Sequence, residues 1–208
     1  MSTPKLERVI AYVDGFNLYF GLKESGFQRY FWLNIKSLVQ NLLKPNQTLV
    51  GVKYFTSLVT NNVEKRLRQK AYINTLMTVE GIQIVYGTFQ SELAHCNICG
   101  IDSRENNEKM TDVNIATHLL SDFYTDQFDM AMLVSGDTDL VPPIKLINES
   151  NTNKRVFIVF PPNRVNDELR KFAKGDMVIG RKKLADSQFE DEIVSQEGQK
   201  MTRPVTWV

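Results

Sequence analysis

The chain has 208 residues, of which 42% are hydrophobic and 24% charged, and its formal net charge at pH 7 is +1. This length fits one domain with a substantial core, with or without appendages, and the near-neutral charge favours no particular class of partner. No stretch reaches the roughly 18–20 apolar residues of a membrane span, the N-terminus lacks signal-peptide features, and two cysteines are too few for a disulfide framework. We therefore expect a soluble cytoplasmic protein.

Strand-like and helix-like segments alternate along the chain. Short apolar runs predict strands, and apolar residues at helical spacing predict helices. In chain order we expect a strand over 9–13, a helix over 34–43, a strand within 49–59, a helix over 62–79, a strand over 82–89, a polar irregular loop over 91–109, a helix over 111–124, a strand over 130–135, a helix over 139–149, a strand over 155–160, a helix near 166–173 and a short strand over 177–179. This alternation predicts an α/β domain with a mainly parallel sheet and helices on both faces. We expect residues 1–183 to form the domain and 184–208 a C-terminal tail or docking segment.

Acidic residues stand at the carboxyl ends of two expected strands, where open parallel sheets form their sites. Asp14 follows the strand over 9–13, and Asp137 and Asp139 follow the strand over 130–135. Asp112 begins the helix over 111–124 on the same face as its apolar stripe, so it should point toward the protein.

Each of these residues also has a purely structural interpretation. Asp14 and Asp137 could shape turns. Asp112 could complement the helix dipole or, like Thr111, cap its helix, and Asp139 could cap the helix that follows it. Taken singly, such roles are the commonest use of aspartate.

Taken together, the four carboxylates favour a metal site. At one sheet edge they would repel one another and raise each other's pKa values. A divalent cation would remove that repulsion, and ligands that are all oxygen select Mg²⁺ or Mn²⁺ over zinc. The residues alone leave open whether the strands that end at Asp14 and before Asp137 are neighbours.

Three segments resemble the signature blocks of the NYN family, a branch of the PIN-like metal-dependent nucleases. They are YVDGFNLYFGL (12–22), EKMTDVNIATHLL (108–120) and DMAMLVSGDTDLVPPIKLI (129–147), in the family's order and spacing. The resemblance covers about residues 9–178 and implies a PIN-like (Rossmannoid) sheet in which the two acid-bearing strands are neighbours. It also implies a catalytic metal site and supporting positions beside it. The implied acids are Asp14, Asp112, Asp137 and Asp139, and the supporting residues are Asn17, Ser135 and Thr138.

The resemblance implies a ribonuclease that hydrolyses phosphodiester bonds of single-stranded RNA with one or two Mg²⁺ or Mn²⁺ ions. RNA rather than DNA rests on the family alone. Asp112 or Asp139 could instead act as a base on the attacking water. Two rivals stay open: a non-catalytic regulator that binds nucleic acid or protein on the same fold, and a phosphatase with a DxD metal site. The phosphatase class usually carries an acid two residues after the first, where this chain has Phe16.

Basic and aromatic residues supply candidates for contacts with RNA. The foremost candidates for phosphate contacts are Arg66, Arg68, Lys109, Arg170 and Lys171. Several aromatic residues follow the first strand, and each either packs the first helix or stacks on an unpaired base. They are Phe16, Tyr19, Phe20, Tyr30, Phe31 and Trp32. We expect packing for most of them, and a packing or surface role for His118.

The segment HCNICG (95–100) has half the ligand spacing of a zinc ribbon. Cys96 and Cys99 are the chain's two cysteines, so a closed zinc site would have to be shared across a homodimer. Two free thiols in a turn are the simpler interpretation, because the second half-site is missing.

Overall fold

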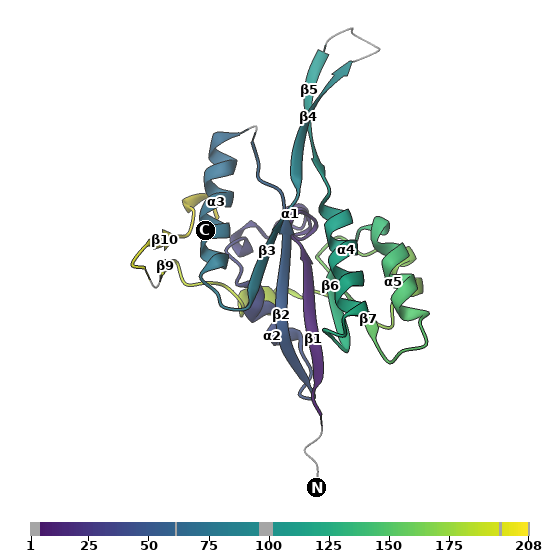
Figure 1. Ribbon diagram of the computed structural model, residues 1–208. Helices are drawn as coiled ribbons and strands as arrows, with labels where there is room; N and C mark the ends of the chain where they lie inside the picture. Colours follow the sequence, from purple (N-terminus) through teal and green to yellow (C-terminus); the bar gives the residue numbers. More distant parts are fainter. Residues whose placement is uncertain (1–4, 61, 96–101, 196, 208) are drawn as a thin grey trace.

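The structure, a computed structural model, describes residues 5–60, 62–95, 102–195 and 197–207. Six strands form one sheet in the order β3-β2-β1-β6-β7-β8, and every neighbouring pair is parallel (Figure 1). The strands are β1 (Glu7–Asp14), β2 (Gln47–Thr56), β3 (Ile82–Tyr86), β6 (Met130–Val134), β7 (Arg155–Phe160) and β8 (Asp176–Val178). The order reverses between β1 and β6, so the acid-bearing strands are neighbours at the switch point of an open parallel sheet.

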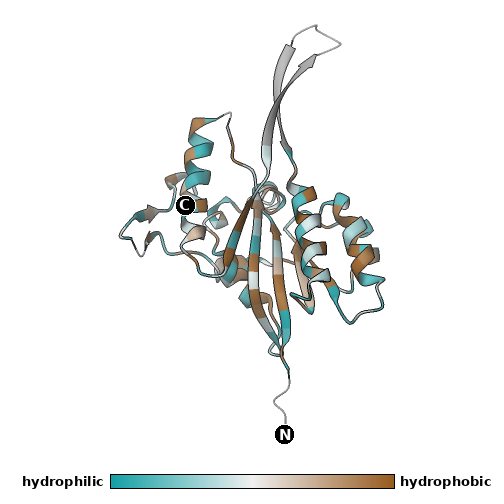
Figure 2. Ribbon diagram, viewed as in Figure 1, coloured by the Kyte–Doolittle hydropathy of each residue, from teal (hydrophilic) through white to brown (hydrophobic). Residues whose placement is uncertain are grey.

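Helices cover both faces of the sheet, as the α/β prediction requires. One face carries α1 (Gly15–Glu24), α2 (Ile35–Leu42) and α3 (Val63–Met77), and the other carries α4 (Thr111–Tyr124), α5 (Val141–Asn148) and α6 (Asp167–Phe172). The central strands are buried on both sides and are therefore almost continuously apolar (Figure 2).

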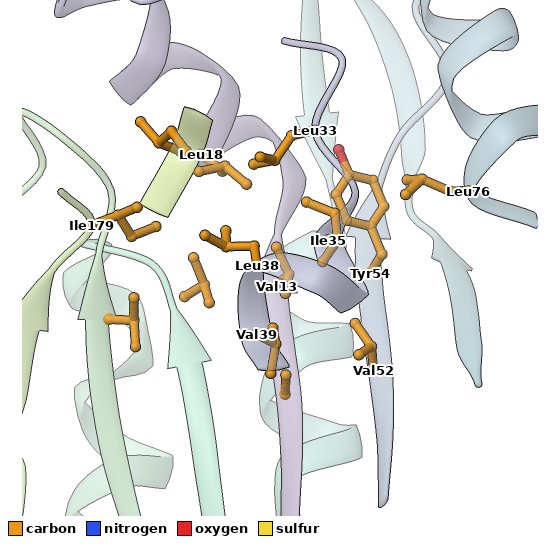
Figure 3. Close-up of a cluster of buried hydrophobic side chains, with 14 of the residues drawn as sticks. Val13, Leu18, Leu33, Ile35, Leu38, Val39, Val52, Tyr54, Leu76 and Ile179 are labelled. Carbon is orange, nitrogen blue, oxygen red and sulfur yellow. The ribbon is translucent and has the colours of Figure 1, made fainter. Parts of the chain in front are cut away.

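The residues of β1 alternate between two separate cores. Val9, Ala11 and Val13 join the core under α1–α3, while Ile10 and Tyr12 join the core under α4–α6. Figure 3 shows part of the first core, with Val13 of β1 among side chains from α1, α2 and β2.

The residues after 183 return to the α1–α3 face. They include the end of α7 (Arg181–Ala185), the hairpin of β9 (Glu192–Val194) and β10 (Lys200–Thr202), and the short helix η3 (Val205–Trp207). Leu184, Phe189 and Trp207 are buried in the first core, and the indole nitrogen of Trp32 donates to the Glu190 carbonyl at 2.8 Å. This segment therefore contributes to the packing of α1–α3, and the domain division at residue 183 stays a prediction.

A long antiparallel hairpin occupies most of the segment that we expected to be irregular. β4 (Thr88–His95) pairs with β5 (Asp102–Lys109) in one-to-one register, so the prediction of a loop over 91–109 is wrong. The expected strand over 82–89 also divides, because β3 ends at Tyr86 and β4 leaves the sheet. The sequence concealed the hairpin because its strands are mostly polar and lack alternation between apolar and polar residues. Cys96 and Cys99 lie outside the described residues.

The hairpin projects from the carboxyl end of the parallel sheet, opposite the N-terminus (Figure 1). It enters from β3 and leads into α4, so it stands at the sheet edge where the acidic residues lie. No helix within the described parts of the chain combines the length and apolar content needed to cross a membrane.

Candidate functional site

Asp14 forms the turn between β1 and α1 and is only 4% exposed. One carboxylate oxygen, Oδ1, accepts the backbone N–H of Asn17 at 2.9 Å, which makes Asp14 the N-cap of α1. The other, Oδ2, accepts the hydroxyl of Ser135 at 3.0 Å. Hydrogen bonds from the first turn of α1 and from the residue that follows β6 therefore fix this carboxylate. Asp14 has both a structural role and the position that a ligand would need.

The turn after β6 is bound directly to the turn after β1. The Ser135 hydroxyl accepts the backbone N–H of Asp137 at 3.1 Å, and the Gly136 N–H donates to Asn17 Oδ1 at 3.0 Å. Gly136 also packs closely against the loop after β7, since a Cβ at this position would lie 2.0 Å from the carbonyl oxygen of Arg164. Asn17 and Ser135 thus hold the two acid-bearing turns together, and their supporting role at a catalytic site stays a prediction.

Asp137 caps a short 3₁₀ helix, η2 (Thr138–Leu140), through a hydrogen bond from the Asp139 N–H to Asp137 Oδ1 at 2.9 Å. The expected helix over 139–149 therefore divides into η2 and α5, and the N-cap residue of α5 is Leu140. The prediction that Asp139 caps its helix is wrong, because the 3₁₀ turn intervenes. Asp139 is exposed and Thr138 is half-buried at this edge.

Asp112 lies in the first turn of α4, whose N-cap is Met110 in a left-handed conformation with φ of 74°. Neither Thr111 nor Asp112 occupies the cap, so the capping interpretation is wrong, whereas Asp112 in the first turn does lie where its charge complements the helix dipole. Burial raises the pKa of Asp112, and repulsion from Asp137 and then from Asp139 raises it further. The acids of α4 and of the turn after β6 therefore share one electrostatic environment.

The site also includes residues that the sequence did not single out. Ser57 follows β2 and is fully buried, and its hydroxyl lies 3.4 Å from the hydroxyl of Thr111 beside Asp112. The position of Thr56 and Ser57 at the carboxyl end of a strand, the same rule that selected Asp14, was the available signal.

A buried polar group anchors α4 against the sheet. Lys53 of β2 forms an ion pair with Asp122 at 2.6 Å, and the Tyr12 hydroxyl donates to the same carboxylate at 2.5 Å. His118 lies 3.2 Å from the Lys53 ammonium and packs edge-on against Phe55, and burial, followed by the positive charge of Lys53, lowers the pKa of His118. The packing role expected for His118 is confirmed, and this network fixes the helix that presents Asp112.

The donor set at the switch point suits a hard divalent cation, because it consists of carboxylate and hydroxyl oxygens. The repulsion that raises the pKa of Asp112 is the kind of interaction that a cation relieves. In the described part of the chain, no three His, Cys, Asp or Glu side chains are grouped closely enough to hold one ion in this conformation. The chemistry of the residues fits a metal, and ligation by several acids would require their side chains to converge.

Three of the candidate phosphate-contact residues lie near this edge or on α3. Arg66 is exposed, and Arg68 forms an ion pair with Glu64 at 3.6 Å on the same helix. Lys109 is exposed at the end of β5, three residues before Asp112. These positions leave their role in binding as a prediction.

The other two candidates lie on α6. Arg170 forms ion pairs with Asp167 at 3.2 Å and Asp176 at 3.1 Å, and the hydrogen bond to Asp176 is the main cause that raises its pKa. Lys171 is exposed beside it. Two carboxylates already compensate the charge of Arg170, which makes α6 a weaker candidate than α3 for attracting phosphate.

Residues 8–179 match the NYN domain family. The chain belongs to this family. The family assignment made from the three sequence segments is therefore confirmed, and NYN membership suggests a nuclease, with nucleic acid as the implied substrate and metal ions as typical cofactors.

Individual proteins also resemble this NYN chain. It is 25% identical over 210 residues to 6-hydroxy-3-succinoylpyridine 3-monooxygenase HspA of Pseudomonas putida, a match that covers 83% of this chain but only 66% of the relative. The crystal structure of a protein of unknown function from Vibrio parahaemolyticus superimposes with a TM-score of 0.57 and 18% identity, covering 91% of this chain and all of that one. The second likeness shows the fold alone and confirms the α/β architecture.

Proposed function

We propose that this NYN domain is a Mg²⁺- or Mn²⁺-dependent ribonuclease that hydrolyses single-stranded RNA at Asp14, Asp112, Asp137 and Asp139. The observation that carries the proposal is the hydrogen-bonded pair of turns after β1 and β6, which carry Asp14 and Asp137 at the switch point of an NYN fold. The raised pKa of Asp112, caused by burial and then by repulsion from Asp137 and Asp139, supports it. Acids from separate parts of the chain at the ligand-binding edge of a parallel sheet are typical of a functional site rather than of independent structural residues.

The residues of the site divide the work of phosphodiester hydrolysis. When bound to these carboxylates, a divalent ion would neutralise phosphate charge and lower the pKa of a bound water. Asp14 is the most rigid acid, because Asn17 and Ser135 hydrogen-bond both of its oxygens. Asp112, half-buried in the first turn of α4, would serve as a metal ligand or as the acceptor for the proton of the attacking water. Gly136 and Ser135 hold the turn that presents Asp137.

The name of the Pseudomonas relative supports a second candidate function, the binding and oxidation of a small pyridine compound. An aromatic-lined pocket beside Gly15 is compatible with such a ligand. The match covers 66% of the relative, so this activity ranks behind the nuclease proposal.

The experiment that tests the proposal uses the purified chain with an end-labelled single-stranded RNA and the DNA of the same sequence, each in EDTA, Mg²⁺ and Mn²⁺. We expect cleavage of RNA only with metal, and its loss in Asp112→Asn. Asp186→Asn is the matched control, because Asp186 is exposed on the C-terminal segment. Cleavage in EDTA, or cleavage that survives Asp112→Asn, would refute the proposal. Binding of RNA without cleavage in any metal would favour the non-catalytic regulator.

A further inference from the structure

A pocket of about 230 Å³ opens beside the turn between β1 and α1, on the α1–α3 face of the sheet. Two lining residues are chain neighbours of the acidic site. Gly15 directly follows Asp14, and Thr56 directly precedes Ser57, whose hydroxyl contacts Thr111. The pocket therefore adjoins the edge of the sheet at which the acidic residues lie. An RNA strand that crosses this edge would have phosphate on the side of the acidic residues and a base on the side of the pocket.

Aromatic side chains of α1 form one wall of this pocket and part of its rim. Tyr19 stacks on Phe31 with ring centroids 4.7 Å apart and an interplanar angle of 28°. Phe16 and Phe20 lie one helical turn apart with centroids 6.1 Å apart, and Phe20 is 39% exposed. The six aromatic residues after β1 thus divide: Tyr30, Phe31 and Trp32 are buried packing residues, whereas Phe16, Tyr19 and Phe20 keep accessible surface.

Cationic side chains border the same pocket. Lys65 and Arg68 of α3 line it opposite α1, and Lys23 lies over the Phe20 ring, 5.9 Å from its centroid. No aspartate or glutamate is among the described residues that line it. A ring-shaped ligand attached to a negatively charged backbone matches both the aromatic wall and the positive rim.

We propose that this pocket receives an unpaired base of the RNA strand, that of a nucleotide adjoining the cleaved bond. The inference rests on the proposed ribonuclease function and extends it to the substrate's conformation. The pocket's volume of about 230 Å³ falls below the roughly 300–1,000 Å³ of sites for drug-sized ligands. This size suits a single ring system. Because a base must leave its helical stack to enter, a duplex would have to unpair and unstack it and would therefore bind more weakly than a single strand. Stacking on aromatic rings is tolerant of sequence, so the pocket selects single strands rather than a particular base.

The test combines a change in the protein with a change in the RNA. The cleaved bond is first mapped with wild-type protein and Mg²⁺, and a single abasic residue is then placed on each side of it in turn. On one side, the abasic residue should lower kcat/KM by about 5- to 150-fold, the range measured for one base–aromatic contact. Phe20→Ala should cause a similar loss on intact RNA and almost none on that abasic RNA, because both changes remove the same contact. Additive losses, or no loss on either side, would overturn the inference while leaving the nuclease proposal intact.

Binding in EDTA provides the arm that does not depend on cleavage. Fluorescence anisotropy with a ten-nucleotide single strand and its duplex should show that the protein prefers the single strand. Phe20→Ala should lower the affinity for the single strand by about 5- to 150-fold. Tyr124→Ala is the matched control, because Tyr124 is 71% exposed at the far end of α4. Binding that depends on Phe20 without any cleavage would support the pocket and refute the nuclease. Absence of RNA binding would overturn the inference. This holds whether or not free adenosine or 6-hydroxy-3-succinoylpyridine saturates the pocket.

Discussion

Replacing Asp137 with asparagine separates the negative charge of this residue from its hydrogen bonds. The asparagine side chain would keep an oxygen at the position that accepts the Asp139 N–H at 2.9 Å, and the backbone N–H at this position would still donate to Ser135. The substitution removes one charge that raises the pKa of Asp112. Charge interactions of solvent-contacting groups amount to about 0–1 kcal/mol, so the metal-free variant should be as stable as wild type or slightly more stable. Asp137→Ala, which loses the cap, should lose about 0.5–2 kcal/mol.

Activity should respond in the opposite direction. In Mg²⁺, Asp137→Asn should lower RNA cleavage by about 100-fold or more, since loss of even an outer hydrogen-bond partner of a metal ligand costs roughly 10–100-fold. Urea unfolding and thermal melts in EDTA and in excess Mg²⁺ measure stability, and a labelled RNA measures cleavage. An asparagine variant that is clearly less stable in EDTA would mean that Asp137 is structural. An asparagine variant that cuts RNA normally would refute its catalytic role.

Four further predictions concern the surroundings of the site. Ser135→Ala should lower the free energy of unfolding by about 1–3 kcal/mol, because it removes a donor to the buried Asp14 carboxylate; an unchanged value in urea unfolding would contradict this. Gly136→Ala should cost about 1–3 kcal/mol or more, because its Cβ would lie 2.0 Å from the Arg164 carbonyl, whereas Gly51→Ala, with no atom within 4 Å, should be tolerated. The raised folded-state pKa of Asp112 means that the metal-free folded protein binds the proton more tightly than the unfolded chain. The stability that Asp112 contributes is therefore present below its unfolded-state pKa of about 3.8 and is lost as pH rises through its folded-state pKa. Asp112→Asn should consequently be more stable than wild type in EDTA at pH 7, and equal stability would contradict the raised pKa. Neutralising Arg66 and Arg68 together should weaken RNA binding and reduce the slope of log affinity against log salt concentration by about 0.7 per lost contact. Neutralising Lys5 and Lys44, near the opposite end of β1 and β2, is the control and should change neither. An unchanged slope for the arginine pair would place the RNA elsewhere.

Local periodicity was enough to predict the elements that build the sheet. The expected helix over 111–124 has the same bounds as α4, and the strand over 155–160 the same bounds as β7, because each has a regular apolar pattern and clear ends. The adjacency of the turns that carry Asp14 and Asp137 could not be derived in this way. It depends on β1 and β6 being neighbours in the sheet although they are far apart in the sequence, and only the family resemblance supplied that pairing.

Features that depend on tertiary contacts could not be predicted from the sequence. The β4–β5 segments are mostly polar and show no alternation between apolar and polar residues, so the sequence suggested a polar loop although the two strands pair in register. The cap assigned to Asp139 was wrong because one 3₁₀ turn shifts the start of α5 beyond it. The pocket required the C-terminal segment to return and place Trp207 against Phe31, with ring centroids 5.5 Å apart. No local pattern encodes such a contact.

Titration with Mn²⁺ in the absence of RNA, followed by isothermal calorimetry, tests the central claim most directly. Asp14 lies in β1, Asp112 in α4 and Asp137 in the turn after β6, so a loss of binding shared by their neutral variants would indicate one common site. We expect saturable binding of at least one ion to the wild-type protein, and at least about 10-fold weaker binding for Asp14→Asn, Asp112→Asn and Asp137→Asn. Asp186→Asn should bind as wild type does. No binding by wild type, or binding that all three variants retain, would contradict the account.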